Sequence, residues 1–294
     1  MRQLSSDYSS RPYKHSEDFE AVMEFLREAY IETGSLQNWL PPRFENSAKG
    51  NEADTRIWKT RSGRIVGAVT PEEKLRFFIQ VHPDHAHLFA EIIDWIDGHF
   101  ATEGRVSIIT LEGDPEREKT LRRHGFEKGG VYGVLRLRDV DAPIPEYRLP
   151  DGFTIRSVEP KDFDELARAV RTVFSHGEWF NSDVLKEISC ASFYHDNLDL
   201  VAVDGRNEIA AFCTFRLDEP SGITELEPMG TLPKYQGLGL AKALLFEGFR
   251  RLKMYTPSLL YIGGAADTPA ANRLYEATGF TNRSDYYYWN KRVQ

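Results

Sequence analysis

A turn between an expected strand and an expected helix carries two glycines and could bind an anion. Glu225–Leu232 is expected to be extended, Gly237 and Gly239 lie in the turn, and helical spacing of apolar residues begins at Ala241. The first amides of a helix lack carbonyl partners, and the helix dipole adds partial positive charge at that end. Glycine also lets a phosphate approach backbone that a side chain would cover. The stretch therefore predicts a phosphate or pyrophosphate site.

The turn differs from the two common phosphate-binding motifs. No Gly-Lys-Ser/Thr follows it, and Lys242 stands where Gly-x-Gly-x-x-Gly has its third glycine. The run Gln236–Ala241 instead resembles the acyl-CoA loop, Arg/Gln-x-x-Gly-x-Gly/Ala, of the GCN5-related N-acetyltransferase (GNAT) superfamily. Downstream, Asn272–Phe280 resembles the second landmark of that family, a loose Asn-x-x-x-Tyr-x-x-x-Gly-Phe. Two motifs in this order indicate the GNAT fold for the C-terminal half.

The resemblance implies an α/β domain whose mixed sheet splays apart after the strand that carries Met229 and Thr231. The pantetheine arm of acetyl-CoA, the implied acyl donor, would lie in that cleft and pair with their backbone as an added strand would. The pyrophosphate would rest on amides of the turn and the helix start. The expected cofactor-binding residues are Met229, Thr231, Gln236, Gly237, Leu238, Gly239, Leu240, Ala241, Lys242 and Asn272. For Asn272, ordering its own turn is the alternative.

Acetyl transfer to an amine requires a base, a donor for the thioester oxygen and an acid. The amine must lose a proton before it attacks, because alkylamines are mostly protonated near pH 7. Glu227, beside the expected thioester position, is the candidate base, and Glu225 is the reserve on the same strand. A backbone amide near Met229 is the oxyanion candidate. The family motif implies Tyr275 as the acid. The alternatives are that Glu227 only attracts a cationic acceptor and that Tyr275 only packs.

The elements that must position these residues fall into two similar halves. Asp139–Gly152 contains three prolines among acidic residues and is expected to be a linker. This divides the chain into an N-terminal domain (1–138), a linker (139–151) and a C-terminal domain (152–294) with the acetyl-CoA site. Gly125-Phe126 corresponds to Gly279-Phe280, and the order of expected elements agrees. We therefore expect two tandem acyl-CoA N-acyltransferase-like domains, each a splayed mixed sheet flanked by helices.

The first half lacks the residues that would bind a pyrophosphate or donate a proton. Its segment Pro83–Phe89 is two residues shorter than its counterpart and contains no glycine. Glu118 and Leu121 stand where the second half has Asn272 and Tyr275. The N-terminal half is therefore expected to be a degenerate copy that serves packing, shapes the acceptor site or supports a homodimer.

Composition excludes several classes of protein. The chain has 294 residues, 41% hydrophobic and 28% charged, with a net charge of -8, which is typical of a globular protein and unlike a nucleic-acid-binding surface spread over the whole molecule. Cys190 and Cys213 are its two cysteines, so no disulfide framework is expected. With no apparent signal peptide and no membrane-spanning run, a cytoplasmic location is expected.

A histidine-rich segment raises the question of a metal site. His82, His85 and His87 lie close together. Structural and catalytic zinc sites need three or four converging ligands, and the sequence shows no partner cluster nearby. We therefore expect a solvated helix start and no metal.

The expected function is an acetyl-CoA-dependent N-acetyltransferase that acts in a ternary complex on a primary amine of a small molecule or peptide. The alternative is an acyl-CoA sensor or scaffold that keeps the loop without turnover. Neither the acceptor nor the acyl-chain preference can be read from the residues.

Overall fold

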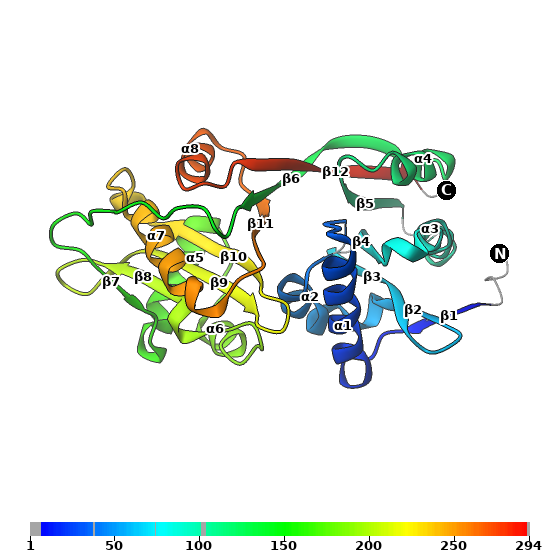
Figure 1. Cartoon of the computed structure of the whole chain (residues 1–294), viewed down its shortest axis with the longest axis horizontal. Coiled ribbons are helices and arrows are strands. Elements are labelled where there is room, and N and C mark those ends of the chain that lie inside the picture. Colours follow the sequence, from blue (N-terminus) through cyan, green and yellow to red (C-terminus); the bar gives the residue numbers. More distant parts are fainter. Residues whose placement is uncertain (1–6, 38, 74, 101–103, 293–294) are drawn as a thin grey trace. The chain divides into compact units, whose positions relative to one another are not determined.

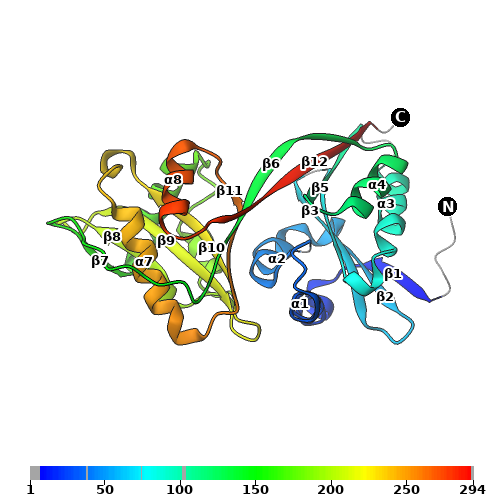
Figure 2. The ribbon, with the colours of Figure 1, turned by 45° about the horizontal axis from the view of Figure 1, so that its top comes forward.

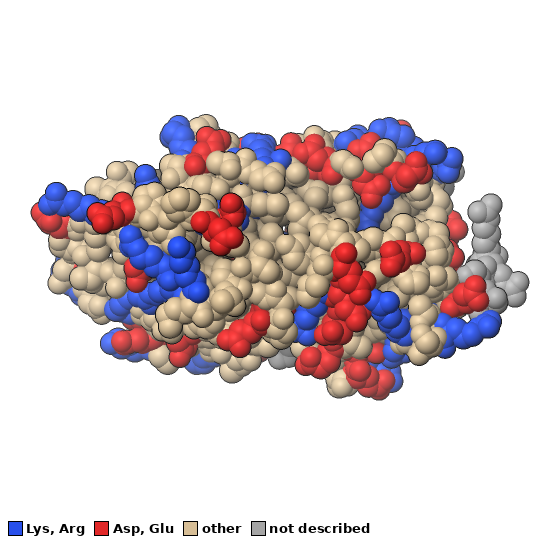
Figure 3. Space-filling model, in the orientation of Figure 1, with Lys and Arg blue, Asp and Glu red and all other residues tan. Residues whose placement is uncertain are grey.

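The computed structural model describes residues 7–37, 39–73, 75–100 and 104–292 (Figure 1). The chain forms two compact units, one from the residues before Leu135 together with those after Arg283, the other from Leu135–Arg283. No helix in the described ranges is both long and apolar enough to span a bilayer. The face shown in Figure 3 carries both signs of charge on each unit.

The first unit is a mixed sheet with helices on both faces. Its strands run in the order β1-β2-β3-β4-β5-β12-β6. Figure 2 shows α1 and α2 on one side of these strands and α3 and α4 on the other. The bounds are β1 Tyr8–Pro12, α1 His15–Thr33, α2 Pro41–Ala48, β2 Arg56–Thr60, β3 Ile65–Glu73, β4 Arg76–Val81, α3 Leu88–His99, β5 Arg105–Leu111, α4 Pro115–Arg123, β6 Glu127–Arg138 and β12 Asn282–Arg292.

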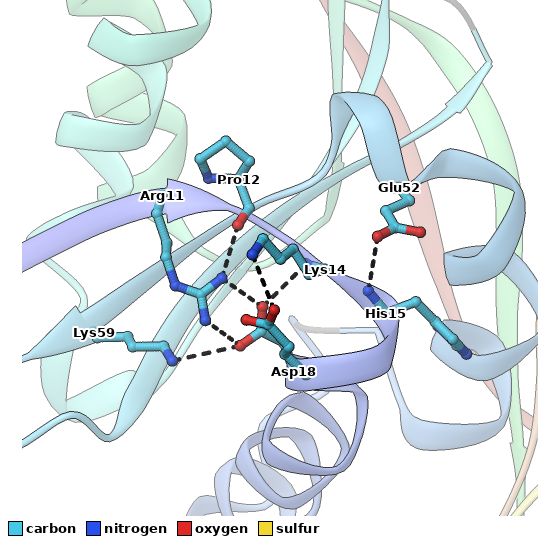
Figure 4. Close-up of polar contacts among 8 residues, drawn as sticks. Arg11, Pro12, Lys14, His15, Asp18, Glu52 and Lys59 are labelled. Carbon is cyan, nitrogen blue, oxygen red and sulfur yellow. Dashed lines mark hydrogen bonds and ion pairs between the residues drawn. The ribbon is translucent and has the colours of Figure 1, made fainter.

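A buried carboxylate fixes the start of α1. The side chain of Asp18 accepts hydrogen bonds from the Lys14 amide (3.0 Å) and from Arg11 Nη1 (2.7 Å), and Lys59 Nζ lies 3.4 Å away (Figure 4). Burial alone would raise the pKa of Asp18, but the hydrogen bonds from Arg11 and Lys14 outweigh it and hold that pKa below its ordinary value. The carboxylate thereby stays charged and ties the first helix to β1 and β2.

The second unit repeats this architecture. Its strands run in the order β6-β11-β10-β9-β8-β7, where the end of β6 supplies the edge strand. Helices α5 and α6 pack on one face, and α7 packs closely on the other, where a Cβ on Gly248 would lie 2.0 Å from the Phe215 ring. The bounds are β7 Thr154–Ser157, α5 Phe163–Phe174, α6 Ser182–Ile188, β8 Asp199–Val203, β9 Ile209–Asp218, β10 Ile223–Thr231, α7 Leu240–Leu252, β11 Leu259–Ala265 and α8 Pro269–Ala277.

The same splayed strand pair occurs in both units. In the first unit β4 and β5 pair in parallel over Arg76–Phe78 and Ser107–Ile109. In the second unit β10 and β11 pair in parallel over Ile223–Glu225 and Leu259–Tyr261. Each time the pairing ends before the strands do. The predicted fold class, a splayed mixed sheet flanked by helices, is confirmed, and the repeated pair supports the internal duplication.

The compact units differ in their limits from the domains expected at 1–138 and 152–294. The last strand, β12, pairs antiparallel with β5 over Tyr286–Arg292 and so joins the first unit. Conversely, the residues of β6 from Leu135 onward join the second unit. A proline-rich linker marks where the chain leaves the sheet, but it does not determine which strands pair afterwards.

Candidate active site

The splay of β10 from β11 opens one edge of β10. Within residues 104–292 the two strands pair only up to Glu225, whereas β10 continues to Thr231. On its other edge β10 pairs with β9, with a register shift between Leu226 and Met229. The edge toward β11 is therefore open to an extended ligand at Met229 and Thr231, where the sequence placed the pantetheine arm.

The glycine turn lies directly after this strand and presents backbone to solvent. Gly237 (φ 79°) and Gly239 (φ 82°) have left-handed conformations, and a Cβ built on either would meet no atom within 4 Å. Helix α7 begins at Leu240 with Gly239 as its N-cap, and residues Gln236 to Gly239 are exposed. Lys242 is exposed in the first turn of α7. An accessible helix N-terminus with adjacent positive charge fits a pyrophosphate.

The Gln236 side chain ties the turn back to the strand. Its Nε2 donates to the Thr231 carbonyl oxygen at 3.3 Å. Since Thr231 O already has this partner, Thr231 would offer a bound ligand its amide more readily than its carbonyl. Leu238 exposes 45% of its surface, and its contact with a cofactor stays a prediction.

Glu227 and Tyr275 come from different elements and act on each other electrostatically. Glu227 is partly exposed on β10, and Tyr275 on α8 exposes 8% of its surface. Burial is the main reason that the pKa of Tyr275 is raised to about 12, the Glu227 carboxylate adds to the rise, and the Arg136 guanidinium opposes it. A phenol with this pKa stays protonated at neutral pH, as a general acid must.

Glu225, the reserve base, has a different environment from Glu227. Its side chain is fully buried, and Arg216 Nη1 on β9, also buried, lies 3.6 Å from its carboxylate. Glu225 and Arg216 are direct cross-strand partners in the register of β9 and β10. A carboxylate engaged in a buried ion pair is poorly placed to receive a substrate proton, so the geometry favours Glu227 as the base.

Asn272 forms part of a chain of polar contacts. Its Oδ1 accepts from Arg136 Nη2 at 2.6 Å, and its Nδ2 donates to Asp267 Oδ1 at 2.8 Å. Asp267 in turn pairs with Arg283 at 3.1 Å. The N-cap of α8 is Thr268, which accepts from the Ala271 amide. With both ends of its amide engaged, Asn272 orders the loop before α8, and a direct contact with a cofactor stays a prediction.

Arg136 and Arg138 are site-proximal residues that the sequence did not single out. Both are buried at the end of β6 and donate to carbonyl oxygens after α8, Arg136 to Phe280 O (3.2 Å) and Arg138 to Thr278 O (3.1 Å). Two arginines in alternation near the end of a strand were the available signal. This signal was missed because the sequence analysis assigned the strand to the N-terminal domain, 1–138.

The corresponding turn of the first unit is built differently. At the start of α3, the guanidinium carbon of Arg117 lies over the Phe89 ring, 4.8 Å from the ring centre. Arg117 Nη1 donates to Gln37 O at 3.3 Å. Burial is the main cause of the lowered pKa of Arg117, about 10. The turn before α3 also lacks the glycines that precede α7, so its backbone does not have the left-handed conformation of Gly237 and Gly239.

The histidine segment differs from the solvated helix start that the sequence predicted. His82 is fully buried, its Nε2 lies 3.3 Å from Glu32 of α1, and Asp84 lies beside them. The partner carboxylate comes from a distant helix, which the sequence could not show. The Asp84 amide donates to His82 Nδ1 at 3.3 Å. Glu32, His82 and Asp84 bring three atoms of the kinds that bind metals within 4.8 Å of one another, so the expectation of no metal stays a prediction.

The comparisons with known proteins agree with this geometry. Residues 163–280 match the model of the acetyltransferase (GNAT) family. These residues form a GNAT acetyltransferase domain. The match spans α5 to the end of the Asn272–Phe280 motif and includes the splayed strands, the glycine turn, Glu227 and Tyr275.

Solved structures extend the GNAT fold over the whole chain. A GCN5-related N-acetyltransferase from Sphaerobacter thermophilus superimposes with a TM-score of 0.66 at 17% identity, covering 99% of this chain and 98% of that one. A tandem GNAT protein from the clavulanic acid biosynthesis pathway gives 0.69 at 13% identity, covering 98% and 99%. The GNAT domain is thus accompanied by a second unit, as in a known tandem protein.

Curated relatives carry the name mycothiol acetyltransferase. The protein from Acidothermus cellulolyticus is 31% identical over 199 residues, which are 61% of this chain and 60% of that protein. The protein from a Nocardioides species is 28% identical over 191 residues, 58% and 64% of the respective chains. The chain therefore spans less than two thirds of the length of either relative.

Proposed function

We propose that this protein is an acetyl-CoA-dependent N-acetyltransferase that moves the acetyl group to a primary amine of a small molecule. The observation that carries the proposal is the open edge of β10 followed directly by the exposed turn Gln236–Gly239, with Glu227 and Tyr275 nearby. The residues present fit the donor: exposed backbone at Gly237 and Gly239 with Lys242 for the pyrophosphate, and, within residues 104–292, an edge of β10 that does not pair with β11 beyond Glu225 for the pantetheine arm. Acetyl-CoA supplies the activated thioester.

The residues of the second unit account for each proton and charge in the transfer. Glu227 accepts a proton from the ammonium of the acceptor, directly or through water. The Met229 amide stabilises the negative charge that develops on the thioester oxygen. Tyr275 donates its phenolic proton to the departing thiolate. The amine attacks directly, so both substrates must be bound together, and initial-rate plots should intersect rather than run parallel as in a ping-pong reaction.

The relatives suggest which acceptors to test first. Since they are named mycothiol acetyltransferases, we propose an amine of the mycothiol class, with peptide amines second. A mass-spectrometric screen for acetylated products across such amines identifies the acceptor. If the protein binds acetyl-CoA but acetylates nothing in the screen, the result favours an acyl-CoA sensor or scaffold over an enzyme.

One molecule of acetyl-CoA should bind per chain. The turn before α3 in the first unit contains no glycine, whereas Gly237 and Gly239 leave the turn before α7 open. Isothermal titration of the full chain with acetyl-CoA measures the stoichiometry. Two equivalents per chain would contradict the proposal, and so would one equivalent that survives disruption of the Gly239 turn, because the phosphates would then bind elsewhere.

Glu227→Gln should lower the rate of transfer most strongly at low pH. Below the pKa of the acceptor amine the substrate arrives protonated and needs the base. As pH rises the free amine becomes abundant and the deficit shrinks. The measurement is kcat/KM for the acceptor against pH. A deficit that is constant with pH would instead indicate that Glu227 only attracts a cation.

Glu225→Gln is the matched control for this experiment. It removes one partner of the buried pair with Arg216, which costs roughly 3–5 kcal/mol of folding free energy when such pairs are broken. We expect a lower midpoint of unfolding in denaturant and no pH-dependent deficit in the remaining folded enzyme. If the pH-dependent deficit follows Glu225 instead, the assignments of the two glutamates must be exchanged.

A further inference from the structure

A buried arginine from the edge strand of the second unit lies beside the proposed acid. Arg136 exposes 2% of its surface. Its guanidinium carbon lies 5.9 Å from the centre of the Tyr275 ring. Arg136 lies outside the segment that matches the GNAT family, residues 163–280, so the family match assigns it no role.

The hydrogen bonds of Arg136 hold α8 at both ends. Nη2 donates to Asn272 Oδ1 at 2.6 Å in the first half of the helix, and Nη1 donates to Phe280 O at 3.2 Å beyond its last turn. Tyr275 lies between these two contacts. The position of its hydroxyl along the helix axis therefore depends on the Arg136 fork, whose five donors form a rigid plane.

The two hydrogen-bond acceptors of Arg136 do not neutralise its positive charge. Both acceptors, the Asn272 amide oxygen and the Phe280 carbonyl, are neutral, and Nε makes no hydrogen bond in the described part of the chain. The charge of Arg136 does act on the Asp267 carboxylate, whose pKa is lowered mainly by Arg283 and Asn272 and to a smaller extent by Arg136. The same cation stabilises any negative charge that forms close by, and more strongly than it would in water.

We infer that Arg136 is a positioning residue for acetyl transfer, which fixes Tyr275 through α8 and stabilises the negative charge left on the phenol when its proton departs. This inference rests on the proposed function. In the step concerned, the C–N bond forms and the thioester C–S bond breaks. The thiolate takes the phenolic proton to give the free CoA thiol. The tyrosinate is then reprotonated by the proton that the amine releases.

A double-mutant cycle on the full chain tests the inference. We expect Arg136→Gln to lower kcat by about tenfold, within the usual range for coupled residues, with little change in KM for acetyl-CoA. In the Tyr275→Phe background the same substitution should cost less than about twofold, because the hydroxyl through which it acts is gone. Arg136→Lys, which keeps the charge, should recover part of the lost kcat. It also provides a second test of the inference if Arg136→Gln does not fold.

Arg138→Gln is the matched control, because Arg138 is equally buried on the same strand and binds Thr278 O after the same helix. Any effect that it has should be the same in both backgrounds. The inference would be overturned if Arg136→Gln lowered kcat equally with and without the Tyr275 hydroxyl, or if Arg136→Lys recovered none of the loss. Acetyl transfer by the wild type would still uphold the proposed function in that case. A wild-type protein that transfers no acetyl group to any amine would overturn the proposed function, and the inference with it.

Discussion

Replacing Gly239 with valine should abolish most of the affinity for acetyl-CoA while the protein stays folded. Gly239 has φ 82°, a region that a β-branched residue enters only with strain, of about 1–2 kcal/mol for an ordinary L-residue. The new side chain would project from the N-cap of α7, over the amides that the pyrophosphate needs. We expect Kd to rise at least about tenfold, equivalent to about 1.4 kcal/mol of binding free energy.

A glycine in the first unit provides the control for backbone strain. Gly63, in the turn between β2 and β3, has φ 90° and open space around it, as Gly239 does. Gly63→Val should therefore cost similar stability and leave the affinity for acetyl-CoA unchanged. Titration of both variants, after their folding is checked by circular dichroism, separates strain from blocking. Wild-type affinity in folded Gly239→Val would mean that the phosphates bind elsewhere.

Tyr275→Phe should lower kcat by about 10²–10⁴-fold, the usual contribution of a general acid, and leave acetyl-CoA affinity nearly unchanged. The ring still packs in its buried position, and only the hydroxyl is lost. Because the pKa of Tyr275 is raised to about 12, mainly by burial, the phenol keeps its proton over roughly pH 6 to 10. The deficit should therefore vary little with pH, in contrast to that of Glu227→Gln.

Tyr147→Phe is the control for loss of a phenolic hydroxyl. The Tyr147 hydroxyl donates to Glu247 Oε2 at 3.1 Å, on the linker side of α7, so its removal should affect stability alone. Steady-state rates with a defined acceptor compare the two variants. A fall in kcat of less than about threefold for Tyr275→Phe, far below what a general acid contributes, would leave Tyr275 a packing residue.

The parts of the site that the sequence predicted are local in the chain. The turn at Gly237 and Gly239 and the helix that follows it are specified within a few residues, because positive φ and helix periodicity are local requirements. Tyr275 could be proposed because its motif is also short. The fold class followed from the resemblance that these two short motifs carry and from the order of expected elements in each half.

The remaining features depend on contacts between segments far apart in the sequence. Pairing of β12 with β5, burial of Glu225 against Arg216, and the approach of Glu32 to His82 all follow from strand register and helix packing. Arg136 illustrates the same point, since it precedes Asn272 by more than a hundred residues and binds it directly. Periodicity predicts which side chains point into the protein, but it does not predict which residues they contact.

The most direct test of acetyl transfer by the second unit is to follow free CoA thiol and acetylated amine in the same reaction, using an acceptor from the screen. The proposed function predicts equal amounts of both products with the wild-type protein, and much less of both with Gly239→Val at an acetyl-CoA concentration below the Kd of the wild type. Binding of one acetyl-CoA per chain, without formation of any acetylated amine across the acceptors of the screen, would contradict it.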